Sequence, residues 1–185
     1  MAVIISLLRG VNVGGHNQIK MDALRALYES LGLRDAQTYV QSGNVVFRTT
    51  QKDLVALARK IQNGIDRIGG FRPEVILRTA SELRKVIARN PFAARRDIDP
   101  RKFLILFLAE EPGPEARSAV LGIKADPEEF RLDGRDVYIY YANGLARPKM
   151  PWMAVEKIVK IPGTGRNWNT VNKLVEMAEQ LEAKE

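Results

Sequence analysis

The sequence contains no cysteine, a single histidine and no long hydrophobic run. Without cysteine, disulfides, thiolate chemistry and cysteine-ligated zinc or iron–sulfur sites are excluded. His16 has no second histidine and no nearby carboxylate cluster, so we expect neither a metal site nor a catalytic triad around it. No apolar stretch approaches the ~18 residues of a membrane-spanning helix, and no membrane partner is expected.

The first apolar run, Ala2–Leu8, is short and no basic residue precedes it, so we expect no signal peptide. Together with the lack of cysteine, this favours a cytoplasmic location. The 185 residues, 45% hydrophobic and 28% charged, suffice for one domain or two small ones. No cofactor is expected.

The positive charge is concentrated in residues 78–102. The net charge is +7, and this stretch holds eight basic and three acidic residues, so eight minus three places +5 of the excess here. A solvated helix face and linker would explain such a run without any partner. Alternatively, it would attract nucleic acid or a phosphorylated ligand. The sequence leaves both interpretations open.

The first part of the chain predicts the element order βαββαβ. Helices are indicated by apolar residues at i, i+3, i+4 and i+7 spacing from about Met21 to Leu31 and from Leu54 to Ile68. Ser42–Gly43 predicts a short hairpin turn. Strands are expected at Ala2–Leu8, Gln37–Gln41, Asn44–Arg48 and Glu74–Arg78.

The second part predicts a similar order. Thr79 and Glu82 form a capping box that opens a third helix. Asn90–Arg101 reads as a connector, and Asp133–Gly134 predicts a second hairpin. Strands are then expected at Phe103–Leu108, Glu129–Leu132, Val137–Tyr141 and near Lys160. Helices are expected from a start at Pro112 or Pro114 through Leu121, at about Pro151–Val159 and after a cap at Asn167 or Asn169.

These orders predict an α+β fold of two tandem ferredoxin-like units, the second modified and closed by a C-terminal helix. The expected domains are unit one at 1–78, a helix and basic connector at 79–101, and unit two with its C-terminal helix at 102–185.

The loop Arg9–Asn17 joins the first strand to the first helix. Strand, glycine-rich loop and helix is an arrangement in which backbone N–H groups can converge on an anion. Gly10 and Gly15 have the spacing of a P-loop. His16 and Asn17 then stand where a P-loop has Lys and Ser or Thr, so the motif fails.

In a βαββαβ unit the first loop and the hairpin between strands two and three share one end of the sheet. We therefore expect the two polar loops to meet there and to bind a phosphate or carboxylate. Turn formation and backbone capping would explain the same residues without a ligand, and the sequence leaves this open. The predicted ligand-binding residues are Arg9, Gly10, Asn12, Gly14, Gly15, Gln41, Ser42 and Asn44.

Secondary candidates are Arg166, Asn167 and Trp168. Trp168 beside a helix cap indicates a side chain that packs into the core. A stacking surface with Arg166 as the cation is the functional alternative.

Four segments resemble the bacterial family called domain of unknown function 1697. They are Leu8–Gly15, Tyr39–Phe47, Asn90–Phe92 and Arg166–Val171. The resemblance implies tandem ferredoxin-like units over nearly the whole chain. It implies no activity, cofactor or catalytic residue.

Three functions are compatible with these observations. The first is binding of an anionic small molecule or nucleic acid, which predicts affinity that falls with salt. The second is an enzyme acting on a phosphorylated or acyl-phosphate compound, by analogy with acylphosphatase, with Arg9 binding the anion and Asn44 positioning water. The third is an interaction protein that pairs through an exposed sheet edge. The sequence does not predict an oligomeric state.

Overall fold

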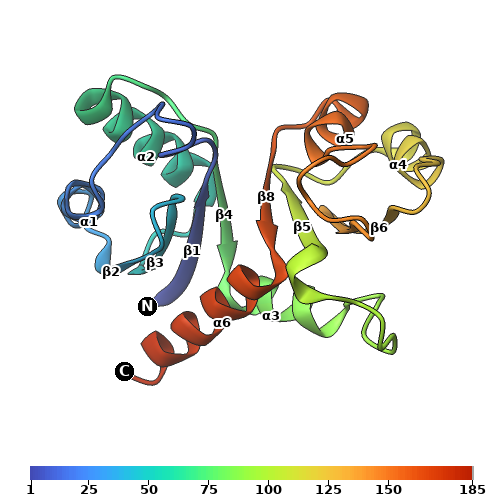
Figure 1. The fold of residues 1–185 in the computed structure, drawn as a ribbon. Coiled ribbons are helices and arrows are strands. Elements are labelled where there is room, and N and C mark those ends of the chain that lie inside the picture. Colours follow the sequence, from blue (N-terminus) through green and yellow to red (C-terminus); the bar gives the residue numbers. More distant parts are fainter. Residues whose placement is uncertain (185) are drawn as a thin grey trace. The chain divides into compact units, whose positions relative to one another are not determined.

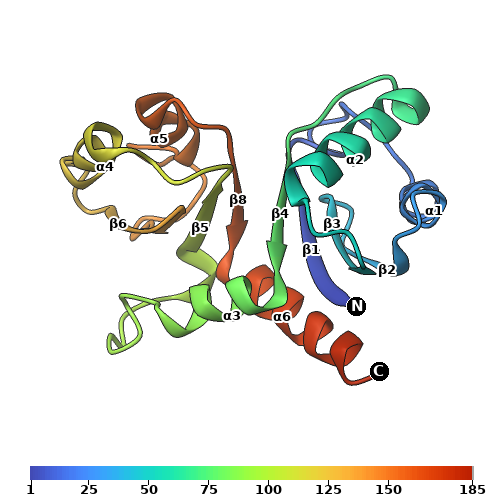
Figure 2. The ribbon, with the colours of Figure 1, turned by 180° about the vertical axis from the view of Figure 1, so that it is seen from behind.

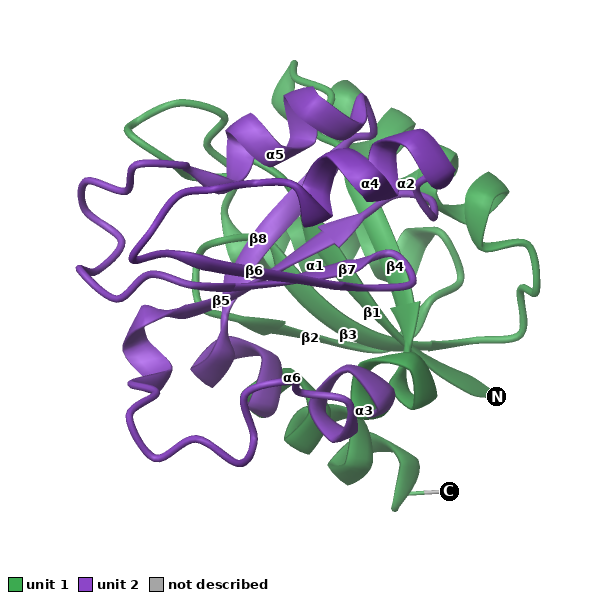
Figure 3. Cartoon of the chain, turned by 90° about the vertical axis from the view of Figure 1, so that its right-hand side faces the viewer, with its two compact units in different colours: residues 1–84, 173–185 green, residues 85–172 purple. Residues whose placement is uncertain are grey.

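The protein has an α+β fold with two four-stranded antiparallel sheets, as seen in a computed structural model that describes residues 1–184. The chain divides into two compact units (Figure 3). Unit 1 comprises residues 1–84 and the C-terminal residues from Lys173 on, and unit 2 comprises residues 85–172. No helix among residues 1–184 combines the length and the apolar character needed to cross a membrane.

Unit 1 forms the sheet β2-β3-β1-β4. Figure 1 shows α1 and α2 on one face of this sheet, where Tyr28 and Ile61 pack in one apolar core with Leu8 and Phe47. The elements in chain order are β1 (Ala2–Leu8), α1 (Met21–Ser30), β2 (Arg34–Tyr39), β3 (Asn44–Thr49), α2 (Leu54–Gly69) and β4 (Val75–Thr79).

The other face of this sheet is also buried. Ile5, Val46 and Ile76 are at most 2% exposed, and they alternate along their strands with the residues that face α1 and α2. Arg48 lies on the same face as Val46 and donates a hydrogen bond to the Leu181 carbonyl. Burial of both faces explains why β1 is a nearly continuous apolar run.

Unit 2 forms the sheet β6-β7-β5-β8, and Figure 2 shows α4 and α5 on one face of it. Val120 and Val155 of these helices pack against Leu106 and Ile139. The elements that follow β4 are α3 (Ala80–Ala88), η1 (Pro100–Lys102), β5 (Phe103–Leu108), α4 (Pro114–Leu121), β6 (Glu129–Asp133), β7 (Asp136–Tyr140), α5 (Trp152–Val159), β8 (Gly163–Asn167) and α6 (Trp168–Glu182).

The two sheets share one strand order and one register. Leu8 N donates to Gly43 O at 2.8 Å, and Leu108 N donates to Arg135 O at 2.9 Å. An arginine occupies the matching position of each fourth strand: Arg78 of β4 lies opposite Ile5 of β1, and Arg166 of β8 lies opposite Ile105 of β5. The element order βαββαβα therefore occurs twice, although few side chains repeat.

The helix that closes each repeat begins and ends in different units. Thr79 caps α3 and Asn167 caps α6, and each is the last residue of the fourth strand of its sheet. Residues 85–88 of α3 belong to unit 2, and the α6 residues from Lys173 on belong to unit 1 (Figure 3). Deletion of the end of α6 would thus remove part of unit 1.

The structure confirms the α+β class and corrects several element bounds. Strand β2 lies at Arg34–Tyr39, not at Gln37–Gln41, because Asp35 has φ +55° and the β2–β3 register shifts between Arg34 and Gln37. The following turn spans four residues, 40–43. Lys160 is the left-handed C-cap of α5, so the last strand starts only at Gly163. The domain bounds at 78 and 101 stay a prediction.

Candidate functional site

The loop between β1 and α1 folds into a small hairpin. Val13 and His16 form an antiparallel bridge, with His16 N donating to Val13 O at 3.0 Å. Gly14 and Gly15 form its tip with φ +58° and +79°, and both are exposed. These angles match a two-residue turn of the primed type. The two glycines therefore serve a protruding turn.

Asparagines close the base of this small hairpin. Asn12 N donates to Asn17 O at 3.1 Å, and Asn17 Nδ2 donates to Gly10 O at 3.1 Å. Both asparagines have positive φ, +54° and +52°. Asparagine tolerates this region better than most residues, which suits these two positions.

The side chain of Asn12 reaches beyond its own loop. Its Nδ2 donates to Ile19 O at 3.0 Å and to Gln41 O at 2.9 Å, while Ile19 N donates to its Oδ1 at 2.8 Å. The loop and the β2–β3 turn thus meet at this side chain, as the strand topology predicted.

The β2–β3 turn is held against the end of β1. Gly43 has φ +74°, and a Cβ atom there would lie 2.7 Å from Leu8 Cβ, so only glycine fits. Asn44 is fully buried, and its Nδ2 donates to Tyr39 O at 3.1 Å and to Ser42 Oγ at 3.0 Å. The amide of Asn44 is therefore engaged inside the turn.

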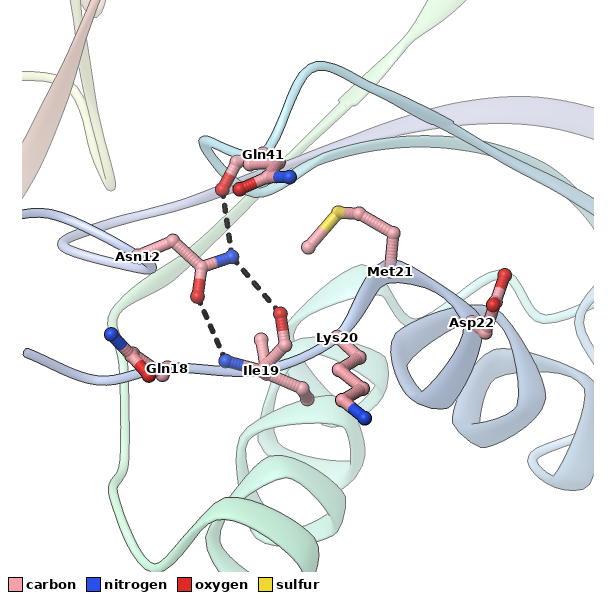
Figure 4. Close-up of a pocket in the computed structure, with 7 residues that line it drawn as sticks. All are labelled: Asn12, Gln18, Ile19, Lys20, Met21, Asp22 and Gln41. Carbon is pink, nitrogen blue, oxygen red and sulfur yellow. Dashed lines mark hydrogen bonds between the residues drawn. The ribbon is translucent and has the colours of Figure 1, made fainter. Parts of the chain in front are cut away.

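A pocket of about 660 Å³ opens where this loop, the β2–β3 turn and the start of α1 meet. Figure 4 shows the Asn12 amide between Gln41 and Ile19, with Met21 and Lys20 at the start of the helix. The lining residues are Asn12, Gln18, Ile19, Lys20, Met21, Asp22 and Gln41.

The pocket has a positive local charge. Lys20 is exposed at the N-cap of α1, where no side chain caps the helix. Asp22 forms an ion pair with Arg25, whose Nη1 also donates to Thr38 Oγ1 at 2.6 Å. The charges of the lining residues Lys20 and Asp22 sum to zero, and Arg25, which does not line the pocket, adds one positive charge beside it. The N–H groups of the first helical turn have no acceptor within the helix and add positive potential.

Two of the eight predicted ligand-binding residues, Asn12 and Gln41, line this pocket. Gly14 and Gly15 lie at the exposed hairpin tip, and Gly10 has φ +68° at its base. Ser42 accepts from Asn44, and the half-buried Arg9 donates its N–H to Glu74 O at 2.9 Å. Whether any of these eight binds a ligand stays a prediction.

Sequence reasoning missed Gln18, Lys20, Met21 and Asp22. The expected polar loop ends at Asn17, whereas the expected helix starts at Met21, so the residues between them were left out of the predicted site. The signal that could have extended the expected site was Asn17, Gln18 and Lys20, which directly precede a helix without a capping side chain.

The secondary candidates lie inside unit 2. Arg166 is 9% exposed, and its Nη1 donates to Thr164 Oγ1 at 2.8 Å and to Gly165 O at 2.9 Å. Burial lowers the pKa of Arg166 to about 10. Asn167 accepts from Thr170 N at 2.8 Å, and Trp168 stacks on Phe103 with ring centroids 4.7 Å apart. Asn167 therefore has the geometry of a helix cap, and Trp168 has that of a side chain packed against the core residue Phe103.

Four of the eight basic residues in the stretch 78–102 form ion pairs with acidic residues. The pairs are Arg84–Glu182 at 2.8 Å, Arg89–Asp133 at 3.2 Å, Arg95–Asp97 at 2.5 Å, Arg95–Glu129 at 2.6 Å and Arg101–Asp99 at 2.9 Å. Hydrogen bonds from Arg95 lower the pKa of Asp97, and those from Arg101 lower the pKa of Asp99.

A protein-family model described as "Protein of unknown function (DUF1697)" matches residues 1–138. A solved structure of a conserved bacterial protein from Streptococcus pneumoniae is similar at 21% identity and a TM-score of 0.75, covering 96% of this chain and 98% of that one. No curated protein matches. The structural likeness shows a shared fold, and the match over 138 of 185 residues shows that the chain belongs to the DUF1697 family.

Proposed function

We propose that this protein binds a small anionic ligand in the pocket of unit 1. The observation that carries the proposal is the joint position of Lys20, Gln18 and Gln41 around a cavity at the uncapped start of α1. A lysine supplies charge, the two amides supply donors, and helix N–H groups favour negative charge. This set suits a carboxylate or a phosphate group.

Comparison of the repeats supports a role for unit 1 in particular. The β1–α1 connection spans residues 9–20, whereas the matching β5–α4 connection spans only residues 109–113. The short connection carries Glu110 and Glu111, which disfavour an anion. The longer loop is the part that lines the pocket, and extended loops on a repeated scaffold commonly carry function.

The alternatives receive less support from the same residues. An enzyme in which Asn44 positions water requires a free amide, but this amide bonds Tyr39 O and Ser42 Oγ. Nucleic-acid binding through residues 78–102 needs many available cations, but Arg84, Arg89, Arg95 and Arg101 are ion-paired and Arg78 is 1% exposed. Lys85 and Arg96 remain as exposed cations there. A small ligand is therefore preferred.

We also propose that each unit is ferredoxin-like. The element order βαββαβ, the sheet orders β2-β3-β1-β4 and β6-β7-β5-β8, and two helices on one face of each sheet support this interpretation. A cytoplasmic location, expected from the lack of cysteine, likewise stays a proposal.

Titration with inorganic phosphate, followed by backbone amide NMR, tests the pocket. We expect saturable shifts at Lys20, Met21 and Asp22 with a millimolar dissociation constant, because a charge-assisted hydrogen bond contributes only about 1.5–3 kcal/mol. Added NaCl should weaken binding. The same titration with acetate tests whether the pocket binds a carboxylate group. Flat titrations with both anions would overturn the proposal.

Lys20→Gln removes the cation at the pocket, and Lys52→Gln removes an exposed cation elsewhere in unit 1 as the matched control. We expect Lys20→Gln to raise the dissociation constant about tenfold, equivalent to about 1.4 kcal/mol. Lys52→Gln should leave it within about twofold, since an exposed charge far from the site is screened. Equal effects would indicate a nonspecific charge response.

A further inference from the structure

Asn12 joins the segments that line the pocket. Its Nδ2 reaches Gln41 O at 2.9 Å and Ile19 O at 3.0 Å, and its Oδ1 accepts from Ile19 N at 2.8 Å. Both amide hydrogens therefore bond backbone carbonyls, one in the turn and one just before α1 (Figure 4). The side chain has no amide hydrogen left for a ligand.

Val40, directly before Gln41, has φ +49°. A β-branched residue in this region is an outlier that persists only where surrounding contacts hold it. On the other side of the turn, Gly43 O accepts from Leu8 N at 2.8 Å. Side chains hold the carbonyls on both sides of the strained residue: Asn44 Nδ2 donates to Tyr39 O from within the turn, and Asn12 Nδ2 donates to Gln41 O from the neighbouring loop.

We propose that Asn12 is the positioning residue of the pocket. It sets the spacing between the β2–β3 turn and the start of α1, and together with Asn44 it holds the turn in the conformation that strains Val40. This assignment deepens the proposed function and rests on it for the ligand. The positioning of the two segments stands on the hydrogen bonds alone.

The test compares Asn12→Gly with Asn17→Gly. Both asparagines have φ near +50°, both use Nδ2 to bond a backbone carbonyl, and both belong to the same loop. Glycine keeps the backbone angle in each case. Only Asn12 lines the pocket, so the pair separates loss of positioning from loss of a loop contact.

Asn12→Gly should speed amide exchange at Ile19, whose N–H loses its acceptor, and shift the Gln41 and Gly43 amides. It should also weaken phosphate binding about tenfold. Asn17→Gly should leave these amides and the affinity nearly unchanged. Equal changes in the two variants, or no change at Ile19 and Gln41 in Asn12→Gly, would overturn the assignment.

A double variant, Asn12→Gly with Val40→Gly, keeps the test decisive if the single variant folds poorly. Glycine at position 40 removes the strain, so the turn should regain its wild-type shifts and part of the affinity. Failure of this rescue contradicts the assignment. If wild-type protein binds neither phosphate nor acetate, the proposed function fails, while the amide-exchange comparison still decides the role of Asn12.

Discussion

Gly43 shows at the scale of one residue how the fold of unit 1 constrains its sequence. Its backbone lies in the left-handed region, and the space that a Cβ would need is occupied by Leu8. Gly14 has a similar angle, φ +58°, yet nothing lies within 4 Å of its missing Cβ. Comparing substitutions at Gly43 and Gly14 therefore separates the free-energy cost of the positive φ from the cost of steric overlap with Leu8.

We expect Gly43→Ala to destabilise the protein by several kcal/mol, since the angle costs about 1–2 kcal/mol and the overlap with Leu8 adds to it. Gly14→Ala should cost only about 1–2 kcal/mol, the angle term alone. Urea unfolding of both variants measures the difference. Equal losses of stability would mean that the Leu8 contact relaxes without cost.

At this scale the sequence allowed correct expectations at some positions where one residue decides the local structure. The turn at Gly43 and the capping pair Thr79–Glu82 are examples, and Glu82 N donates to Thr79 Oγ1 at 3.1 Å. The sequence left open whether the Asn12 side chain binds a ligand or hydrogen-bonds the backbone of its own loop. That choice depends on Gln41, which lies 29 residues away, and local pattern does not contain such a contact.

At the scale of elements, strands and helices with regular periodicity were predicted well. Strand β5 occupies the expected Phe103–Leu108 because it is apolar throughout. Strand β2 was displaced because a positive φ at Asp35 interrupts its alternation. Only two of the seven residues that line the pocket were among the expected site residues, because the pocket depends on where α1 begins relative to the turn.

The segment 90–99, between α3 and η1, has no helix or strand, and specific contacts fix it within unit 2. Arg95 hydrogen-bonds Asp97 and Glu129 and lies over the rings of Phe92 and Tyr140 at 5.6 and 5.7 Å. Tyr140 Oη donates to Asp97 O at 3.1 Å. A single guanidinium therefore links this segment to β6 and β7.

This arrangement predicts a pH dependence at Asp97. Because its folded-state pKa is lowered, its contribution to stability is present above the ordinary value of 3.8 and is lost as pH falls through the lower folded-state value. Arg95→Gln should return the pKa of Asp97 toward 3.8.

Carboxyl NMR titration of both proteins measures this shift. Asp99, whose partner is Arg101, should keep its lowered pKa in Arg95→Gln and serves as the internal control. An unchanged titration of Asp97 in the variant would contradict the role given to Arg95.

At the scale of the whole molecule, sequence neighbours and structural neighbours differ. Arg84 pairs with Glu182, and Arg48 donates to the Leu181 carbonyl, all within unit 1. Periodicity predicted α6 as a helix, but the unit that its end joins could not be predicted, because an apolar stripe does not identify the surface that it covers.

We expect a protein that ends at Asn172 to lose stability mainly in unit 1, although the deleted residues follow unit 2 in sequence. The deletion removes the buried side chains of Leu174, Ala178 and Leu181, and each buried leucine contributes about 1.5–3 kcal/mol. Hydrogen exchange should therefore rise in β1 and β3 and stay low in β5 and β7. Faster exchange confined to unit 2 would contradict the division.

The path of α6 also has a consequence for synthesis. Unit 1 starts at the N-terminus, but its last residues are translated only after the 88 residues of unit 2, 85–172. At about 5–20 residues per second, translation of that stretch takes about 4–18 s. During this time the nascent unit 1 exposes the apolar positions that α6 later covers. For those seconds this apolar surface of the N-terminal unit stays uncovered and open to aggregation.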